Sequence, residues 1–470
     1  MLQKIRNEVK LLLMSFLFLG LILYAAYQFL GAPVIATIND WIVAQKEQQT
    51  LQQYISTGNK ILVLANTNYH KQAGVQAFAQ DDFATAYNLF KLSLKSDPND
   101  PESKIYLNNS TALLSSKSTV KIVVSVPIGS NLNVASEILR GVAMGQNEIN
   151  QKGGVNNQKL LLVQIANDNN DPALSKRLAS YFVSDPNIEA VVGNNASNAS
   201  VAACPIYQQG KLVMISPTSF SQQLSECGEY VFRTVPSIRS AAERLADYVL
   251  KIARKTRIAV CSDYEALDNR SFKNEFNWVF NAGGGEIVNT ECNLSAPNFN
   301  PSVAISQAIS AGADSLLLGP HIDRINKAIE VSRANKGRLA MFGSPTLYTF
   351  QTLQSGQADV NGLILAVPWH PKQGDRFVAN ASSLWGAAVS SWRSATSYDA
   401  VLAIVEGLKL QQYSTRDGLQ QIMHSTSFSV VGATGKIHFL PSGDRNLEAS
   451  LVQVKPGNIS GTGYDFVSLS

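Results

Sequence analysis

From Val120 onward, the chain alternates short apolar runs with amphipathic segments of helical length. The apolar runs are rich in β-branched residues and include VKIVVSV, KLLLVQIA, IEAVVG, KLVMIS, RIAVCS, GEIVNT, DSLLLG and GLILAV. Continuous runs of this kind are typical of strands buried on both faces of a parallel sheet, with crossover helices between them. This part has about 350 residues, more than one ordinary domain holds, so the pattern predicts two α/β lobes.

A long uncharged run lies near the N-terminus. It extends from residue 11 to residue 39, and Lys4, Arg6 and Lys10 precede it. The run exceeds both the roughly 20 residues that cross a bilayer and the roughly 7–15 apolar residues of a signal peptide. We therefore expect residues 1–39 to hold an uncleaved transmembrane helix, with a cleaved signal peptide as the alternative. The positive-inside rule then predicts a plasma-membrane protein with a cytoplasmic N-terminus, whose remaining chain is periplasmic.

Residues 40–118 are predicted to form a helical linker. Residues 40–66 combine many glutamines with spaced apolar residues, which favours a helix. The following stretch, about residues 67–100, resembles a tetratricopeptide repeat and therefore implies a helix pair. The repeat has characteristic positions for small residues, for an aromatic residue and for a helix-ending proline. These positions are occupied here by Gly74, Ala77, Ala86, Phe90 and Pro98. The pair is predicted to be either a protein-docking module or a helical spacer.

Composition excludes several classes of function. Hydrophobic residues make up 45% of the chain and charged residues 16%, which excludes a disordered protein. The net charge is only +4, and no cluster of Lys and Arg is interleaved with aromatic residues, so we expect no nucleic-acid partner. The five histidines are dispersed, and the chain has neither an H-E-x-x-H nor a Cys-x-x-Cys motif. We therefore expect no metal, no cofactor and no catalytic residues.

Several motifs, in order, resemble those of the type I periplasmic binding proteins, in particular the leucine/isoleucine/valine-binding branch. They are RGVAMGQNEINQKGGVNNQKLLL, ANDNNDP, the segment from VVGNNASNAS to VFRTVPS, SYDAVLAIVEGL and GATGKIHFLPSGDR. The resemblance covers residues 119–470 and implies two doubly wound parallel sheets, one in each lobe, that close on a small ligand. The expected lobes are residues 119–236 with 369–433, and residues 237–368 with 434–470.

The resemblance places ligand-binding residues after the IEAVVG strand of the first lobe. Gly193 ends this strand, and the segment NNASNAS, which contains Asn195, leads into a helix. Free amide hydrogens at a helix start favour a bound carboxylate. The serine that anchors the ligand's carboxylate in the family falls at Ser197. Ordinary N-capping of the helix is the alternative role for this hydroxyl.

A second ligand-binding loop is expected after the KLVMIS strand. Thr218 and Ser219 match the second anchoring loop of the family. Phe220 stands where the family has a threonine, so a hydroxyl is missing there. Thr218 occupies a position that uses backbone groups in the family, so we expect it to bind ligand in the same way.

The second lobe offers several candidates for binding an α-amino group. Asp263, Glu265 and Asp268 follow the RIAVCS strand, and the family's tyrosine position falls near Asp268. Asn298 lies close to the position where the family has an acidic residue. A solvated carboxylate is the alternative for each acidic residue.

The resemblance implies an extracytoplasmic solute-binding protein of an ABC importer, with a permease as its partner. The expected ligand is an amino acid of the branched-chain type or a related small carboxylate. The alternative is a regulatory or protein-interaction role with an unused cleft, because activators of cell-wall synthases join helical repeats to this same fold.

The four cysteines fall into two candidate pairs. Cys261 and Cys292 end consecutive predicted strands, which usually neighbour each other, so a disulfide between them outside the cytoplasm is one expectation. Buried free thiols are the alternative for this pair. The sequence leaves a bond between Cys204 and Cys227 open as well.

Overall fold

The computed structural model describes most of the chain after residue 45. The described residues are a few isolated positions before residue 25 and the ranges 46–65, 67–372, 374–386, 391–411 and 415–469. By its internal contacts the chain divides into two compact units, residues 1–53 and residues 54–470. The run over residues 11–39, where we expect a membrane anchor, lies outside the described residues except at isolated positions. Among the described residues, no helix is both long and apolar enough to cross a bilayer.

A six-stranded sheet forms the core of the first lobe, in the order β1-β3-β2-β4-β5-β6. Strands β2 to β6 pair in parallel, with Val124 of β2 opposite Ile165 of β3 and Val192 of β4. The inner strands are buried on both faces, which explains their continuous apolar sequences. The strands are β1 (Ile55–Ser56), β2 (Ser118–Val126), β3 (Lys159–Asn167), β4 (Ile188–Val192), β5 (Val213–Ser216) and β6 (Val231–Arg233).

A seven-stranded sheet forms the core of the second lobe, in the order β15-β14-β11-β10-β9-β7-β8. The strands are β7 (Arg257–Ser262), β8 (Glu286–Val288), β9 (Ser315–Gly319), β10 (Ala340–Gly343), β11 (Ile364–Val367), β14 (Ser450–Pro456) and β15 (Tyr464–Ser468). Strand β14 pairs antiparallel with both β11 and β15, and β1 pairs antiparallel with β3. The prediction of purely parallel sheets is therefore wrong at the edges, and both sheets are mixed. The short connection between β14 and β15 permits only an antiparallel pair, because a parallel pair needs a long crossover.

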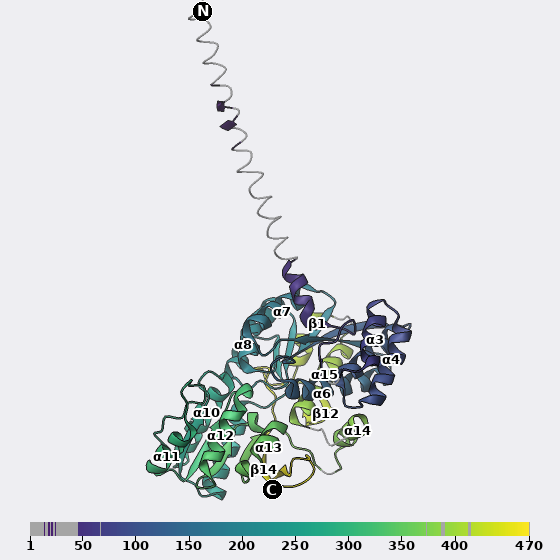
Figure 1. The fold of residues 1–470 in the computed structure, drawn as a ribbon. Coiled ribbons are helices and arrows are strands. Elements are labelled where there is room, and N and C mark those ends of the chain that lie inside the picture. Colours follow the sequence, from purple (N-terminus) through teal and green to yellow (C-terminus); the bar gives the residue numbers. More distant parts are fainter. Residues whose placement is uncertain are drawn as a thin grey trace, which may run out of the picture. The chain divides into compact units, whose positions relative to one another are not determined.

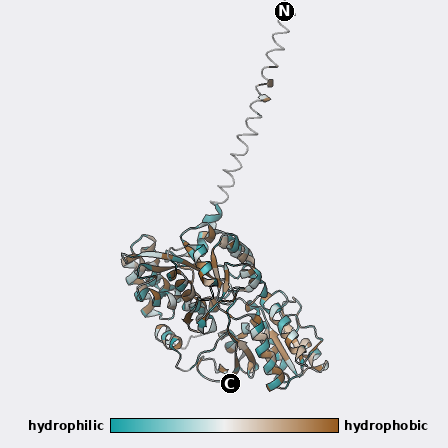
Figure 2. Ribbon diagram, turned by 180° about the vertical axis from the view of Figure 1, so that it is seen from behind, coloured by the Kyte–Doolittle hydropathy of each residue, from teal (hydrophilic) through white to brown (hydrophobic). Residues whose placement is uncertain are grey.

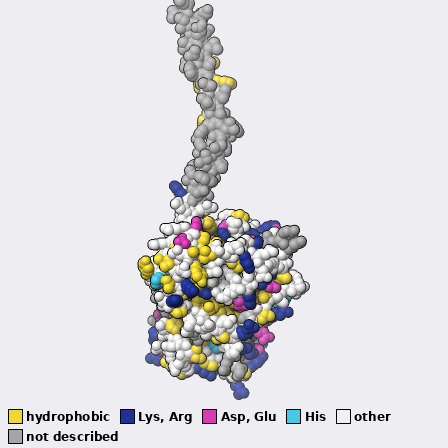
Figure 3. Space-filling model, turned by 90° about the vertical axis from the view of Figure 1, so that its right-hand side faces the viewer, with side chains coloured by type: hydrophobic (Ala, Val, Ile, Leu, Met, Phe, Trp, Pro, Cys, Tyr) yellow, Lys and Arg dark blue, Asp and Glu magenta, His cyan; other side chains and the backbone are white. Residues whose placement is uncertain are grey.

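Helices cover both sheets (Figure 1). Figure 2 shows hydrophobic residues concentrated on the strands, whereas the helices also carry hydrophilic residues. On the face in Figure 3, Lys and Arg side chains are scattered among uncharged ones. The helices of the first lobe are α6 (Leu132–Gln151), α7 (Pro172–Ser184), α8 (Ser197–Gln209), η3 (Gln222–Glu226), α15 (Trp392–Lys409) and α16 (Arg416–His424). Those of the second lobe are α9 (Ile238–Asp247), η4 (Tyr248–Ile252), α10 (Leu267–Ala282), α11 (Pro301–Ser310), η5 (Ile322–Arg324), α12 (Ile325–Asn335), η6 (Pro345–Leu347), α13 (Phe350–Gly356) and η7 (Gln357–Val360).

The chain passes between the two sheets at three places: after β6, after β11, and after the hairpin of β12 (Val430–Gly432) and β13 (Gly435–Ile437). Helix α14 (Arg376–Trp385) lies in the second of these passages. Pro236 of the first passage and Arg445 of the third form an isolated parallel bridge. Arg445 also forms an ion pair of 3.0 Å with Asp399 of α15, and both side chains are fully buried. The Asp399–Arg445 pair therefore joins the passages to the first lobe.

The predicted helical linker differs from the structure over its first part. A helix covers residues 46–51, and a short η2 helix (Gln52–Tyr54) follows it. Residues 55–56 then form strand β1, at the edge of the first sheet. Directly after β1 the backbone turns at Gly58, whose φ of +140° is unfavourable for other residues. The prediction of a helix through residue 66 is therefore wrong.

The rest of the linker is helical and packs on the first lobe. Helices α3 (Tyr69–Ala79) and α4 (Phe83–Ser96) form a pair, in which a Cβ atom at Gly74 would lie 2.8 Å from the Phe90 ring. The small residue thus permits the close approach that the sequence implies, while the assignment to the tetratricopeptide family stays a prediction. Helix α5 (Pro101–Leu114) packs against both α6 and β3.

Buried polar side chains hold α5 in place. Asn109 Nδ2 donates to the Val163 carbonyl at 2.7 Å, and Asn109 Oδ1 accepts from the Val163 amide at 3.0 Å. This side chain therefore pairs with β3 as a neighbouring strand would. Lys71 of α3 forms ion pairs with Asp100 at 2.8 Å and with Glu102 of α5 at 2.7 Å, and all three side chains are buried. Helices α3 to α5 are thus an integral part of the first lobe.

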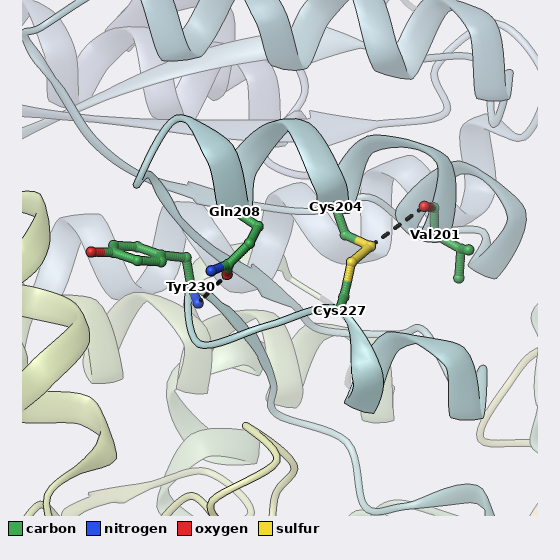
Figure 4. Close-up of a disulfide and its surroundings, with 5 residues drawn as sticks. All are labelled: Val201, Cys204, Gln208, Cys227 and Tyr230. Carbon is green, nitrogen blue, oxygen red and sulfur yellow. Dashed lines mark hydrogen bonds between the residues drawn. A yellow bond between two sulfur atoms is a disulfide. The ribbon is translucent and has the colours of Figure 1, made fainter.

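Both cysteine pairs form disulfides. Cys204 of α8 is bonded to Cys227, which directly follows η3 (Figure 4). In the same region, the Tyr230 amide donates to the Gln208 side chain at 3.0 Å (Figure 4). Cys261 at the end of β7 is bonded to Cys292, so the alternative of two free thiols is wrong.

Candidate functional site

A pocket lies between the lobes, beyond the carboxyl ends of β4 and β5. Ligands of open parallel sheets bind at such strand ends, where loops and helix N-termini converge. The space among its lining residues is about 360 Å³, part of which is open to solvent. The lining residues are Asn195, Ala196, Ser197, Thr218, Phe220, Asp268, His321, Ile322, Thr346, Trp392 and Arg393.

Helix α8 begins at the pocket without a side-chain cap. Its first residue is Ser197, and the preceding Ala196 offers no hydroxyl or carboxylate to the first backbone amides. Ser197 therefore does not cap this helix, which was the alternative role for its hydroxyl. Uncapped amides at a helix N-terminus, together with the helix dipole, attract an anion.

The Ser197 hydroxyl can donate a hydrogen bond into the pocket. Its oxygen accepts one bond from Ser219 Oγ at 3.0 Å and one from the Phe220 amide at 3.2 Å. A serine oxygen has two acceptor sites and one proton, so both acceptor sites are filled and the proton is left for another acceptor. Ser219 does not line the pocket and acts here by orienting Ser197.

Thr218 and Asn195 use their side chains to hold the two loops together. Thr218 Oγ1 donates to the Asn195 carbonyl at 2.9 Å, and Asn195 Nδ2 donates to the Asn170 side chain at 3.1 Å. Both residues nevertheless line the pocket. Because the Thr218 hydroxyl already has an acceptor, the backbone of Thr218 is the part available to a ligand, as the resemblance implies.

Two aromatic side chains form an apolar wall of the pocket. The Phe220 and Trp392 rings have centroids 5.7 Å apart and are both buried. Ile322 of the second lobe also lines the pocket. The indole N–H of Trp392 is buried and has no hydrogen-bond partner in the protein. A buried donor of this kind favours binding of a polar ligand atom.

Among the three acidic candidates of the second lobe, only Asp268 lines the pocket. The carboxylates of Asp263 and Glu265 form ion pairs with the Arg324 guanidinium, at 2.7 Å and 2.6 Å. Their negative charges are therefore already balanced by a cation of the protein. Asp268 lies in the first turn of α10 and accepts from the Thr346 hydroxyl at 3.2 Å. Burial of the Asp268 carboxyl raises its pKa, and His321 opposes this effect.

Asn298, which was expected near the ligand's amino group, does not line the pocket. Its side chain is exposed in the loop that precedes α11. The preceding part of this loop is held by a hydrogen bond from the Leu294 amide to the Ser262 carbonyl. The position of an acidic residue in the family therefore does not transfer to Asn298.

Sequence reasoning missed the basic residue of the pocket. Arg393 is 2% exposed, donates to the Tyr348 carbonyl at 2.7 Å and lies 3.4 Å from Glu137. Burial lowers the pKa of the Arg393 guanidinium, and Glu137 opposes this effect. Arg393 lies four residues before the start of the SYDAVLAIVEGL motif, in the same helix α15, so its proximity to that motif was the available signal. The other missed lining residues are Ala196, His321, Ile322, Thr346 and Trp392.

No group of three or more His, Cys, Asp or Glu side chains that could hold a metal ion occurs in the described part of the chain. The pocket instead combines three elements: hydrogen-bond donors and a guanidinium on the first lobe, a carboxyl on the second, and an apolar wall between them. This combination matches a small molecule with a carboxylate, a second polar group and an apolar part.

The chain is similar to several known binding proteins. A Leu/Ile/Val-binding protein homolog of Brucella melitensis is 28% identical over 184 residues, which are 39% of this chain and 49% of that relative. The chain thus spans about half the length of this curated relative. A substrate-binding protein of an ABC transporter from Desulfitobacterium hafniense, solved in complex with Leu, has a TM-score of 0.62 at 22% identity. The match covers 74% of this chain and all of that chain.

A solute-binding protein of an ABC transporter from Rhodopseudomonas palustris, solved in complex with 3,4-dihydroxybenzoic acid, has a TM-score of 0.64 at 20% identity. This match covers 75% of this chain and 96% of that chain. At such identities the two solved structures establish the shared fold. The family model for periplasmic binding proteins matches residues 119–458, so the chain belongs to the periplasmic binding protein family.

Proposed function

We propose that this protein is the substrate-binding component of an ABC importer for amino acids with apolar side chains or for related small carboxylates. The observation that carries the proposal is the uncapped start of α8 at Ser197, which lies in the same pocket as Asp268 of the other lobe. A site for an anion and a site for a cation in one pocket fit the two charges of an amino acid. The protein is proposed to bind and release its ligand without chemical change.

Each part of the ligand has a proposed partner. The carboxylate binds the first amides of α8 and the hydroxyl of Ser197, with Arg393 adding positive charge. The ammonium group binds Asp268, and the side chain lies against Phe220 and Trp392. Backbone groups of Asn195 and Thr218 complete the site, and Ser219 orients Ser197.

The N-terminal part of the chain is proposed to hold the protein at the outer face of the plasma membrane. This proposal rests on the uncharged run over residues 11–39 and on the basic residues before it. The proposed ligand-binding lobes lie within residues 119–470, and β1 with helices α3 to α5 completes the first lobe. The helix pair of α3 and α4 is proposed as a surface for a protein partner, such as the permease.

The proposal is tested by a thermal-shift screen of the full-length chain in detergent, because a ligand that binds only the folded state raises its melting temperature. The panel contains the L-amino acids and a series of benzoates, and calorimetry then measures the affinity of each stabilising compound. We expect stabilisation by at least one apolar amino acid or small carboxylate. A panel without any stabilising compound would contradict the proposal and favour the regulatory role with an unused cleft.

Replacing Ser197 by alanine should weaken binding of the compound found in the screen. The variant loses one hydrogen bond to a charged group, worth about 1.5–3 kcal/mol, which corresponds to roughly a tenfold to hundredfold loss of affinity. Calorimetric titration measures this loss. Ser180→Ala, which changes an exposed serine of α7, is the control and should bind as the parent does. Equal affinity of Ser197→Ala and the parent would contradict the carboxylate site.

Replacing Asp268 by asparagine should weaken binding of an amino acid, again by roughly tenfold to hundredfold, because a charge-assisted bond is lost. An amino acid needs the ionised form of Asp268. Since burial raises the pKa of Asp268, affinity in the parent should fall, as the pH is lowered, at a higher pH than for an exposed carboxylate. This pH dependence should be absent from the variant.

The control for Asp268→Asn is Glu265→Gln, which changes a carboxylate that pairs with Arg324 and does not line the pocket. Calorimetry from pH 4 to pH 8 distinguishes the two variants. If Asp268→Asn binds an amino acid with the parent's affinity at every pH, the ammonium assignment is wrong.

A further inference from the structure

Two helices begin on opposite sides of the cleft, and neither start is capped from its own lobe. Helix α8 of the first lobe follows Ala196, and helix α10 of the second lobe follows Ala266; neither alanine provides a side-chain cap. The second residue of α8 is Asn198. Its Oδ1 accepts from the Leu267 amide at 3.0 Å, which is the first amide of α10. The cap of α10 therefore comes from the other lobe.

Asn198 forms a second bond across the cleft. Its Nδ2 donates to the Glu265 carbonyl at 2.9 Å. The oxygen and the nitrogen of the Asn198 side-chain amide thus both form hydrogen bonds with the backbone of the opposite lobe. Two further contacts near the starts of these helices, from Asn170 to Asp323 and from the Gln222 amide to Ser271, are longer at 3.4 Å and 3.3 Å. Across the pocket, Arg393 of α15 donates to the Tyr348 carbonyl of the second lobe at 2.7 Å.

The residues at the two ends of this contact are next in sequence to Ser197 and Asp268, which are proposed to bind the two charged groups of the ligand. Asn198 follows Ser197, and Leu267 precedes Asp268. Ser197 and Asp268 line the pocket, whereas Asn198 and Leu267 do not. The Asn198 contact therefore constrains the separation between the site for the carboxylate and the site for the ammonium group without contacting the ligand itself.

We propose that Asn198 is a closure latch that determines the length of the ligand. This inference rests on the proposed function. The two bonds of Asn198 form only when the lobes are closed, and they fix the distance between the N-termini of α8 and α10. A ligand whose carboxylate and ammonium groups sit on one carbon atom, such as an α-amino acid, leaves the latch intact. A longer ω-amino acid holds the two helix starts apart and prevents the bonds from forming.

The latch is tested with the full-length chain and three variants. Asn198→Ala removes both bonds. Asn198→Asp keeps an acceptor for the Leu267 amide and loses the donor to Glu265. Ser271→Ala is the matched control, because it removes a longer contact across the cleft, one helical turn further along α10, and leaves the pocket lining unchanged.

The first readout is calorimetry with L-leucine and with 5-aminopentanoic acid. We expect the parent to prefer L-leucine strongly. Asn198→Ala should bind L-leucine about tenfold more weakly, the loss expected for two ordinary hydrogen bonds. The same variant should bind 5-aminopentanoic acid as the parent does, so its preference shrinks. Asn198→Asp should be intermediate, and Ser271→Ala should stay within about twofold of the parent.

The second readout measures closure directly and does not depend on a ligand. Spin labels at Lys176 of α7 and Ser310 of α11 report the distance between the lobes by double electron–electron resonance. Both positions are exposed, and the four native cysteines are bonded in pairs, so that introduced cysteines react alone. Without ligand, Asn198→Ala should show a smaller closed fraction than the parent and Ser271→Ala.

The outcomes separate the latch from the proposed function. An unchanged closed fraction in Asn198→Ala, or an unchanged preference for L-leucine, would overturn the latch. If the parent binds neither compound nor any other amino acid, the proposed function fails and the ligand-length claim fails with it. A closed fraction that still depends on Asn198 would then support only the latch as a device for closure.

Discussion

Replacing Arg445 by methionine should lower the free energy of unfolding by about 3–5 kcal/mol, because it leaves the carboxylate of Asp399 buried without its cation. Both side chains of the pair are fully buried, at a distance of 3.0 Å. Asp399 also accepts from the Thr434 hydroxyl at 2.5 Å and from the Ala433 amide at 2.6 Å. These bonds hold the oxygens of Asp399 and do not supply a positive charge.

Chemical denaturation of the full-length chain, followed by circular dichroism, measures this loss. Arg333→Met is the matched control, since Arg333 forms an exposed ion pair with Asp359 at 2.9 Å, and exposed pairs contribute about 0–1 kcal/mol. The double variant Asp399→Asn with Arg445→Met should recover part of the stability, because no unpaired charge stays buried. A denaturation midpoint of Arg445→Met equal to that of the parent would show that the pair is not a source of stability.

A chain that begins at residue 119, the domain boundary expected from the sequence, should fail to fold cooperatively. Helix α5, which it lacks, packs on α6 and β3 and buries Ile105 and Tyr106 completely. Each large apolar side chain that loses such burial costs about 1.5–3 kcal/mol. The truncation also leaves the buried amide and carbonyl of Val163 without Asn109. These losses together approach the total stability of a domain, about 5–15 kcal/mol.

The control for this truncation is a chain that begins at residue 46, which keeps β1 and helices α3 to α5 and should unfold cooperatively on heating. Near-ultraviolet circular dichroism and binding of a hydrophobic dye distinguish the two chains. Asn109→Ala in the full-length chain should have an intermediate melting temperature, since it loses the bonds to β3, to Gln146 and to the Thr57 carbonyl but keeps the rest of α5. A cooperative transition of the chain from residue 119, at the parent's temperature, would contradict the integral role of α5.

The parallel strands could be predicted from the sequence because a strand that is buried on both faces has an almost continuous run of apolar residues. The segment VKIVVSV of β2 is an example. Strand β1 has only two residues, Ile55 and Ser56, so no periodicity marks it. Its surroundings come from tertiary structure, because Asn109 of α5 donates to the Thr57 carbonyl directly after β1 at 2.7 Å. The direction of β14 and β15 depends on the short connection between them and not on their apolar content.

The first-lobe part of the candidate site could be located because helix starts that follow parallel strands collect at one edge of a sheet. Ser197 and Thr218 follow β4 and β5 and do line the same pocket. The second-lobe part could not be resolved from the sequence, because three acidic residues follow β7 within six positions. Arg324, distant in the sequence, pairs with Asp263 and Glu265 and leaves Asp268 to the pocket. Arg393 comes from a still more distant helix.

The bond between Cys204 and Cys227 has a consequence for how this protein is produced. It closes a loop of 23 residues that contains Thr218, Ser219 and Phe220. A bond closing a loop of this length contributes about 3 kcal/mol in the chain-entropy model. Thiols stay reduced in the cytosol of a bacterial host. Protein expressed there therefore lacks the bond that constrains this ligand-binding loop. Secretion or oxidative refolding is needed to obtain protein with the native disulfide, on which ligand affinities should be measured.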